Sequence, residues 1–321
     1  MLSKHREIRI QGVKVADTPT LIPSFSSKGF PDVDKIVKVL APTITDSALL
    51  SAFDIFHKHV KQVPEGPAVL ILDSGGYESS ADTELSDTKM NNYVPVDWTP
   101  EQLRSVLDKW SAPQPTIAVS YDHSSHRRPL LEQIEDARGL FKGRGFGREI
   151  LIKPESDNRS RVEIEAVIKN IHELRDFDVI GFTEKELGYS IFNRMYNIKR
   201  VREALSRIGL DTPIHIFGSL DTISTPLYFL AGADIFDGLT WLRYSYSFGH
   251  AVYTRNAAAI KYTLRMNDDD IDARIWYENY QEMLNLEYSM RRHIREGTFE
   301  CFGDHGPMFE RAYKELFATK S

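Results

Sequence analysis

The chain has 321 residues, with 40 Lys and Arg against 46 Asp and Glu, so its formal net charge is −6. A composition of 41% hydrophobic and 27% charged residues is typical of a globular protein with a large core. The single cysteine, Cys301, excludes a disulfide framework and any zinc or redox site built from paired cysteines. No apolar run approaches the roughly 18 residues of a membrane span, and the first residues lack the apolar core of a signal peptide. We therefore expect a cytoplasmic protein without a membrane partner.

Eight short apolar segments recur along the chain, each of the length of a buried parallel strand. They cover residues 20–25, 36–41, 68–73, 116–122, 149–153, 177–182, 213–218 and 233–239. Helical patterns separate most of them, at residues 46–60, 99–110, 129–141, 161–174, 191–208 and 227–231. Strands that alternate with helices in this way predict an α/β fold, a (β/α)8 barrel of the TIM type, with a doubly wound sheet as the alternative.

The same pattern divides the chain into two parts. We expect the barrel to occupy residues 1–252 and to carry an irregular, polar insertion at about 78–96. Residues 253–321 are predicted to form a helical extension that packs against the barrel. The first connection, 26–35, is too short for a full helix, whereas Thr99, Pro100 and Gln102 predict a helix start with a capping box.

Acidic residues mark the ends of three predicted strands. Asp73 and Asp122 end the third and fourth strands, and Asp237 lies inside the eighth. Because the C-terminal strand ends of such a barrel meet at one mouth, we expect the three carboxylates to converge there. Each alone could be a turn former or a helix cap, but a carboxylate inside an apolar run is costly to bury without a partner. Two carboxylates at a barrel mouth suit chemistry at a glycosidic carbon, with one as nucleophile and one as acid and base.

Two segments carry a family resemblance. Residues 70–77 read LILDSGGY around Asp73, and residues 233–237 read ADIFD and end in Asp237. In these segments, and in order over roughly residues 20 to 256, the chain resembles the tRNA-guanine transglycosylase superfamily. The resemblance implies that Asp73 is the general acid and base, that Asp237 is the nucleophile and that Asp122 binds the purine edge. It implies further substrate contacts from Ser74, Gly75, Lys153, Gly181, Phe182, Gly218 and Arg243.

The chain also departs from the family pattern. The zinc site of the family, three closely spaced cysteines and a later histidine, has no counterpart, so we expect no metal or other cofactor. Lys153 and Pro154 stand where the family has Gln-Gly, which leaves the base specificity open. With these departures, the chain resembles a branch of the family that inserts a 7-deazaguanine base into DNA rather than tRNA.

The leading hypothesis is therefore exchange of guanine in a polynucleotide for a free 7-deazaguanine, with DNA favoured over tRNA. Arg127, Arg128 and Arg159 follow the fourth and fifth predicted strands and are expected to form a rim that contacts nucleic-acid phosphates, although a solvated charged surface is an equal alternative. An N-glycoside or nucleoside hydrolase of barrel fold is the alternative enzyme. A non-catalytic nucleic-acid-binding paralogue is a further alternative, which the presence of both Asp73 and Asp237 disfavours. The sequence does not decide whether the chain forms a homodimer or binds a partner subunit.

Overall fold

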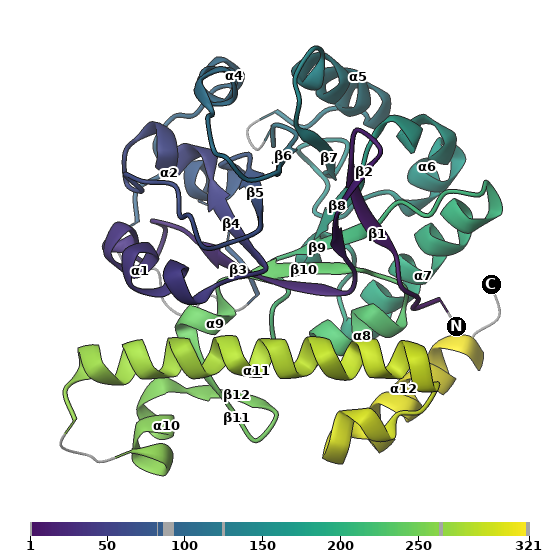
Figure 1. Cartoon of the computed structure of the whole chain (residues 1–321). Helices are drawn as coiled ribbons and strands as arrows, with labels where there is room; N and C mark the ends of the chain where they lie inside the picture. Colours follow the sequence, from purple (N-terminus) through teal and green to yellow (C-terminus); the bar gives the residue numbers. More distant parts are fainter. Residues whose placement is uncertain (1, 82, 86–92, 124–125, 263–265, 319–321) are drawn as a thin grey trace.

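The computed structural model describes residues 2–81, 83–85, 93–123, 126–262 and 266–318. At its centre, parallel strands close into an eight-stranded barrel, in which the last strand, β10, pairs with both β3 and β9 (Figure 1). The barrel strands are β3 (Thr20–Phe25), β4 (Ser47–Ser51), β5 (Val69–Asp73), β6 (Thr116–Val119), β7 (Gly147–Ile152), β8 (Val179–Thr183), β9 (Ile214–Phe217) and β10 (Ile235–Gly238). The predicted (β/α)8 barrel is confirmed.

Helices connect the strands and surround the barrel. The α-helices are α1 (Val33–Leu40), α2 (Ala52–Phe56), α3 (Gly76–Ser79), α4 (Pro100–Lys109), α5 (Leu130–Phe141), α6 (Ile164–Lys169), α7 (Ile191–Arg207), α8 (Ser224–Leu230) and α9 (Thr240–Arg243), and the 3-10 helices are η1 (Ala41–Thr43), η2 (Ile171–Asp176) and η3 (Glu184–Glu186). The predicted capping box begins α4, because Thr99 Oγ1 accepts the Gln102 N–H at 3.3 Å and Gln102 Oε1 accepts the Thr99 N–H at 2.8 Å. A large apolar core fills the layer between strands and helices, and a smaller one fills the barrel.

The second strand and its neighbouring helix were predicted wrongly. Residues 36–41, expected as a strand, belong to α1, whose buried residues Val33, Ile36, Val37 and Leu40 follow helical spacing. The strand is instead β4, inside the segment 46–60 that was expected to be helical. All five residues of β4 are buried, but serines at both of its ends shorten its apolar run. The helix expected over 161–174 also begins later, and its second half is the 3-10 helix η2.

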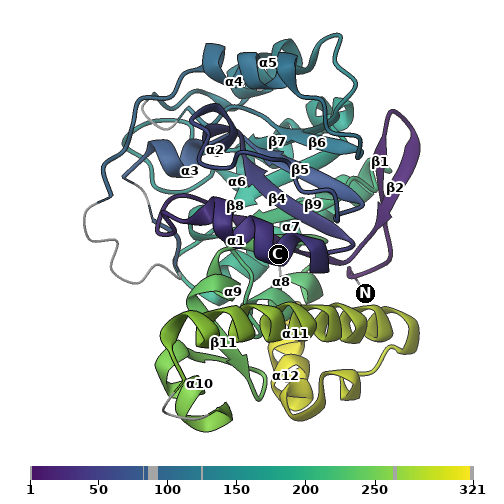
Figure 2. The same cartoon turned by 60° about the vertical axis from the view of Figure 1, so that its left-hand side comes forward.

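An N-terminal hairpin covers the end of the barrel opposite to α3 (Figure 2). Its strands, β1 (Glu7–Ile10) and β2 (Val13–Asp17), pair antiparallel outside the barrel sheet. Ile8 and Ile10 are buried in the apolar core that fills the barrel. A Cβ atom on Gly147, at the start of β7, would lie only 2.9 Å from Ile10 Cγ1, so the glycine admits the hairpin. The hairpin thus closes the N-terminal end, and the interior opens to ligands at the other end.

Beside the hairpin lies a buried ion cluster. Asp234 Oδ1 accepts from Arg6 Nη1 at 2.6 Å, and its Oδ2 accepts from Arg202 Nη2 at 2.5 Å and from the Ile214 N–H at 2.8 Å. The side chains of Arg6, Arg202 and Asp234 are at most 2% exposed. The cluster joins the N-terminal segment, α7 and the residue preceding β10 at the closed end of the barrel.

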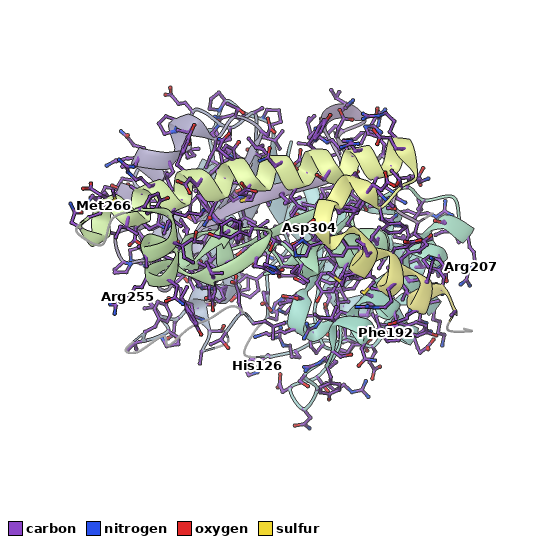
Figure 3. The ribbon with its side chains drawn as sticks, turned by 90° about the horizontal axis from the view of Figure 1, so that it is seen from below. His126, Phe192, Arg207, Arg255, Met266 and Asp304 are labelled. Atoms are coloured by element: carbon purple, nitrogen blue, oxygen red, sulfur yellow. The ribbon has the colours of Figure 1, made fainter. Side chains whose placement is uncertain are left out.

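The C-terminal part of the chain lies along one side of the barrel. It forms β11 (Tyr244–Ser247), β12 (His250–Tyr253), α10 (Thr254–Lys261), α11 (Asp268–Glu296), η4 (Glu300–His305) and α12 (Gly306–Ala318). Seen from below, α11 and α12 cross this side of the molecule (Figure 3). Glu287 of α11 accepts the Leu21 N–H at 2.9 Å and so attaches the extension to β3.

Two further expectations concern the limits of these parts. The boundary expected after residue 252 falls within β12. Residues 82 and 86–92 of the predicted insertion lie outside the described residues. Within the parts of the chain that are described, no helix has both the length and the apolar character needed to cross a membrane.

Candidate active site

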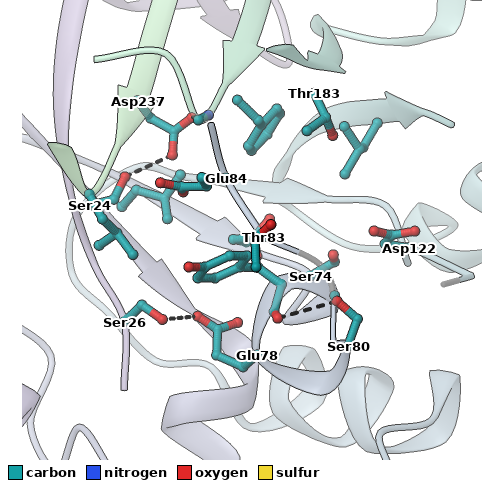
Figure 4. Close-up of a pocket in the computed structure, with 18 of the residues that line it drawn as sticks. Ser24, Ser26, Ser74, Glu78, Ser80, Thr83, Glu84, Asp122, Thr183 and Asp237 are labelled. Atoms are coloured by element: carbon teal, nitrogen blue, oxygen red, sulfur yellow. Dashed lines mark hydrogen bonds between the residues drawn. The ribbon is translucent and has the colours of Figure 1, made fainter. Parts of the chain in front are cut away.

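A pocket opens at the C-terminal mouth of the barrel, and carboxylates from five positions line it (Figure 4). Asp73, Asp122 and Asp237 come from the strands and loops predicted to supply them, and Glu78 and Glu84 come from the segment after β5. The structure therefore brings the three predicted aspartates together at one mouth. Glu78 and Glu84 were not singled out from the sequence, because their place in the pocket depends on the path of an irregular segment.

Asp237 is held at the pocket wall by donors on both of its oxygens. Ser24 Oγ donates to Oδ2 at 2.7 Å, and the Gly218 N–H donates to Oδ1 at 3.2 Å. Gly238 N–H donates to Ser24 Oγ at 3.2 Å and orients that hydroxyl. Gly218 has a φ of +77°, a conformation that favours glycine, and in this turn its amide faces the carboxylate. Asp237 is 5% exposed, so it presents a fixed, nearly buried carboxylate to the pocket.

Behind Asp237 lie two buried residues that sequence analysis missed. His215 Nε2 lies 3.2 Å from Asp237 Oδ1, and His215 Nδ1 donates to Glu149 Oε1 at 2.7 Å. Burial by itself lowers the pKa of His215, but the Glu149 and Asp237 carboxylates raise it to about 9. Burial also raises the pKa of Glu149, although His215 acts to lower it. A pKa of about 9 for His215 corresponds to an imidazolium at neutral pH. The signal was present in the sequence, since a glutamate and a histidine interrupt two of the predicted apolar strands.

Asp73, the last residue of β5, has a carboxyl group with a raised pKa. Burial raises the pKa of Asp73 to about 7, and the nearby charges of Asp237 and Asp122 raise it further. The hydrogen bond that the Gly75 N–H donates to Asp73 at 3.0 Å acts in the opposite direction and lowers the pKa. Ser74 and Gly75 shape this turn: Trp98 Nε1 donates to the Ser74 carbonyl at 2.7 Å, and Gly75 has a φ of +86°. A Cβ on Gly75 would lie 2.7 Å from Phe53 Cβ, so only glycine fits. Asp73 can thus give or take a proton near neutral pH.

Asp122 belongs to a buried charge cluster. Its Oδ1 accepts from Arg127 Nη1 at 2.6 Å, and its Oδ2 lies 3.2 Å from Lys153 Nζ. Lys153 also reaches Glu186 at 2.8 Å and Thr183 Oγ1 at 3.0 Å. Burial alone would raise the pKa of Asp122, but the two cations lower it below its usual value. Asp122 therefore stays ionised, as an acceptor of hydrogen bonds at the pocket wall.

Glu78 is a buried carboxyl with a raised pKa. Its Oε1 accepts from Ser26 Oγ at 2.5 Å (Figure 4), and its Oε2 accepts from Ser51 Oγ at 2.7 Å. Burial, followed by the charges of Asp54 and Asp73, raises its pKa to about 8. Glu78 is thus mostly protonated at pH 7, which limits the negative charge around the pocket.

The remaining predicted substrate contacts are placed differently. Phe182 packs between the barrel and the helices, and Gly181 faces the barrel interior below the pocket. Neither residue is among those that line the pocket in the described part of the chain. Arg243 Nη1 donates to Glu84 at 2.7 Å and its Nη2 to Tyr77 Oη at 2.9 Å, which fixes two residues of the pocket wall.

The three arginines predicted as a rim do not form one surface. Arg127 and Arg159 line a second cleft with Arg161 and Lys185, and this cleft shares Ser80, Asp122 and Lys185 with the first pocket. Arg128 lines a separate pocket, where its Nη1 donates to Asp136 at 2.9 Å. Arg127 is mostly buried because it pairs with Asp122. The cleft beside the active-site pocket thus holds four cations among its described residues, with Asp122, Asp157 and Glu186 also in its lining, and Arg128 is outside it.

No protein-family model matches the chain, and no curated protein matches it significantly. In the described residues, no group of three or more His, Cys, Asp and Glu side chains is arranged to hold a metal ion.

Proposed function

We propose that this chain is a guanine transglycosylase that exchanges guanine in a polynucleotide for a 7-deazaguanine base. The observation that carries the proposal is a division of roles between two carboxyls of one pocket. Asp237 is fixed by donors on both oxygens, as a nucleophile should be, and the pKa of Asp73 is raised to about 7, as an acid and base should have. Carboxyls whose environments differ in this way are characteristic of acid–base and nucleophilic pairs.

The proposed reaction consists of two displacements. Asp237 attacks the sugar carbon C1′, the C1′–N9 bond breaks, and the departing guanine takes its proton from Asp73. The products of this step are free guanine, a glycosyl ester on Asp237 and an ionised Asp73. The incoming base then gives its N9 proton to Asp73 and attacks C1′, and the ester C–O bond breaks to restore Asp237. Two inversions give net retention at the sugar carbon.

Asp122 is proposed to bind the purine edge. The N1–H and exocyclic amine of guanine are donors, and an ionised carboxylate accepts from both. Arg127 contacts Oδ1 of Asp122, and Lys153 contacts Oδ2. Each oxygen has a second lone pair that can accept a hydrogen bond from the base. The cations also keep Asp122 ionised, which this role requires.

The second cleft is proposed to hold the backbone of the polynucleotide. Arg159, Arg161 and Lys185 line it next to the pocket, where a phosphate flanking the target nucleotide would lie. The absence of a cysteine-based zinc site and the presence of Lys153 and Pro154 favour DNA over tRNA. In a duplex the target base has to leave the stack, at a cost of a few kcal/mol that phosphate contacts offset.

The deciding experiment is competition between matched DNA and tRNA for exchange of labelled guanine, with the nucleosides analysed by mass spectrometry. We expect label and candidate 7-deazaguanines to enter DNA. Efficient turnover of tRNA with none of DNA would overturn the choice of polymer. Release of guanine without incorporation of a base would identify a hydrolase, and binding without turnover of either polymer would identify a nucleic-acid-binding protein.

The basic cleft predicts a salt dependence. Arg159→Gln with Arg161→Gln should weaken binding and reduce the slope of log affinity against log salt by about one for each phosphate that the protein no longer neutralises. Arg128→Gln is the matched control, because Arg128 pairs with Asp136 outside the cleft and should leave the slope unchanged. Equal slopes for the two variants, measured by fluorescence anisotropy, would exclude the cleft as the backbone site.

The raised pKa of Asp73 predicts a pH dependence of the first displacement. The proton of Asp73 is needed for guanine to leave, so formation of the covalent complex should fall about tenfold per pH unit above about 7. Single-turnover gels that resolve the protein–polynucleotide complex measure this rate. Asp73→Asn should give a low rate that is nearly independent of pH between 6 and 8. A flat wild-type profile over that range would exclude Asp73 as the acid.

A further inference from the structure

Three strands place a line of charged side chains inside the barrel. Glu149 comes from β7, His215 from β9 and Asp237 from β10. The first two are completely buried, and their neighbours in the barrel interior are apolar. Among the described residues, the charged groups that face the His215 ring are Glu149 and Asp237, and Phe217 stacks on the ring at 3.9 Å. The line therefore runs from the barrel interior to the pocket wall and ends at the proposed nucleophile.

Gly181 makes this line possible. It lies on β8, between β7 and β9, and pairs with Leu151 on one side and with His215 on the other. A Cβ at this position would lie 2.9 Å from Glu149 Oε1 and 2.6 Å from the Phe217 ring. A side chain on β8 would thus fill the space through which the Glu149 carboxylate reaches across to His215. The glycine has a structural role in the line rather than a place beside the base.

A buried ion pair of this kind is not explained by stability. Burying two charges costs about as much as their attraction returns, and apolar residues of similar size would pack at least as well. Glu149 Oε2 and His215 Nε2 have no hydrogen-bond partner among the described residues, which adds to the cost. His215 Nε2 therefore meets Asp237 Oδ1 as a charge contact at 3.2 Å. Residues retained at such a cost are expected to act on a neighbouring group, and the group that His215 reaches is Asp237.

We propose that Glu149 and His215 are positioning residues that hold Oδ1 of Asp237 and thereby assign Oδ2 as the atom that attacks the sugar. This inference rests on the proposed function, because it gives Asp237 the role of nucleophile. His215 and the Gly218 N–H both face Oδ1, whereas Oδ2 is held by the hydroxyl of Ser24, which can rotate away.

The arrangement has a different effect on each displacement. When the ester forms at Oδ2, Oδ1 becomes its carbonyl oxygen and stays next to the imidazolium of His215. In the second displacement the C1′–Oδ2 bond breaks and its electron pair returns to the carboxylate, so negative charge grows beside that cation. A preorganised positive charge beside a site of growing negative charge stabilises the transition state. His215 therefore speeds release of Asp237 from the sugar more than it speeds the attack.

The test uses Glu149→Gln in the full chain, a change that keeps the shape and removes the charge. The covalent complex is formed on a DNA target without an incoming base and then chased with excess guanine. His215→Gln, which removes the group beside Asp237, should slow decay of the complex about 100-fold, with a smaller effect on its formation. Glu149→Gln, which leaves the ring in place, should slow the decay less. His293→Gln is the matched control, because His293 is a buried histidine far from the pocket, whose Nδ1 meets the Thr298 carbonyl at 2.9 Å. Equal decay rates in Glu149→Gln and wild type would overturn the proposal.

The pH profile of the decay gives a readout that a purely structural role would not move. In the wild type the rate should rise with pH as Asp73 ionises to accept the proton, and fall at higher pH as His215 loses its own. Esterified Asp237 carries no charge in the complex, so Glu149 is then the anionic partner of His215, and the fall should come below the pKa of about 9 that His215 has in the free protein. In Glu149→Gln the upper limb should move to still lower pH, because this anionic partner is gone. An upper limb at the same pH in the variant and the wild type would overturn the proposal.

A substrate-free measurement separates this inference from the proposed function. NMR titration of histidine-labelled protein, with His215→Gln to assign the signal, should show His215 losing its proton near pH 9, and at lower pH in Glu149→Gln. A neutral His215 at pH 7 would overturn the positioning role even if exchange is observed. Failure of the wild type to form a covalent complex with any polynucleotide, with the His215 titration as expected, would overturn the proposed function and leave the imidazolium beside Asp237 established.

Discussion

Replacing Asp237 with asparagine is expected to abolish base exchange, with formation of the covalent complex slowed by about 10⁴-fold or more, as for removal of other enzymatic nucleophiles. An amide of the same shape cannot attack the sugar carbon, so the loss should appear in the chemical step. The fold and the affinity for the polynucleotide should be nearly unchanged, because the asparagine side chain would fill the same space. Single-turnover kinetics and circular dichroism measure the effects on chemistry and fold, and fluorescence anisotropy measures the affinity.

Asp221→Asn is the matched control for this substitution. Asp221 follows β9 at the same end of the barrel, but it accepts hydrogen bonds from the Ile223 and Ser224 N–H groups, each at 2.7 Å, and does not line the pocket. Its variant should exchange bases at close to the wild-type rate. If the Asp237→Asn protein did so as well, Asp237 could not be the nucleophile.

Replacing Asp234 with alanine should lower the free energy of unfolding by about 3–5 kcal/mol, the cost of breaking a buried ion pair from one side. The change leaves Arg6 and Arg202 buried without their shared carboxylate and removes the acceptor of the Ile214 N–H. Asp211→Ala is the control, because Asp211 is 65% exposed and pairs with Lys4 at 2.6 Å, so its loss should cost less than about 1 kcal/mol. Urea unfolding measures both, and similar losses would show that the buried cluster contributes no more than a surface pair.

Local sequence patterns predicted an element correctly where a single apolar run or a single helix cap defined it. The strand 20–25 matches β3, and the capping box at Thr99 begins α4, because runs of apolar residues and cap residues act over a few positions. The pattern failed at residues 36–41, where an apolar run belongs to an amphipathic helix, and at β4, whose terminal serines are buried by the surrounding barrel. Burial of a serine depends on tertiary packing, and no local pattern encodes it.

In the candidate site, too, some features could be predicted from the sequence and others depend on tertiary packing. Convergence of Asp73, Asp122 and Asp237 followed from barrel topology, because the ends of parallel strands meet at one mouth. The ion pairs that Asp122 forms with neighbouring cations depend on side-chain directions that topology does not fix. The contact between His215 and Asp237 could be recognised only from the distance between two strands. The need for glycine at position 181 could be recognised only from the atoms that a side chain there would meet.

The seam at which the barrel closes has a consequence for the synthesis of the protein. Ser24 lies on the first barrel strand and Asp237 on the last, 213 residues apart, and their hydrogen bond crosses the pairing of β3 with β10. A nascent chain that has emerged only as far as β9 carries Asp73, Asp122 and His215 but lacks Asp237, the proposed nucleophile. If Asp237 has that role, reactivity toward a sugar is acquired in one late step, when the final strand docks, and a chain arrested before it would not react with the nucleic acids around the ribosome.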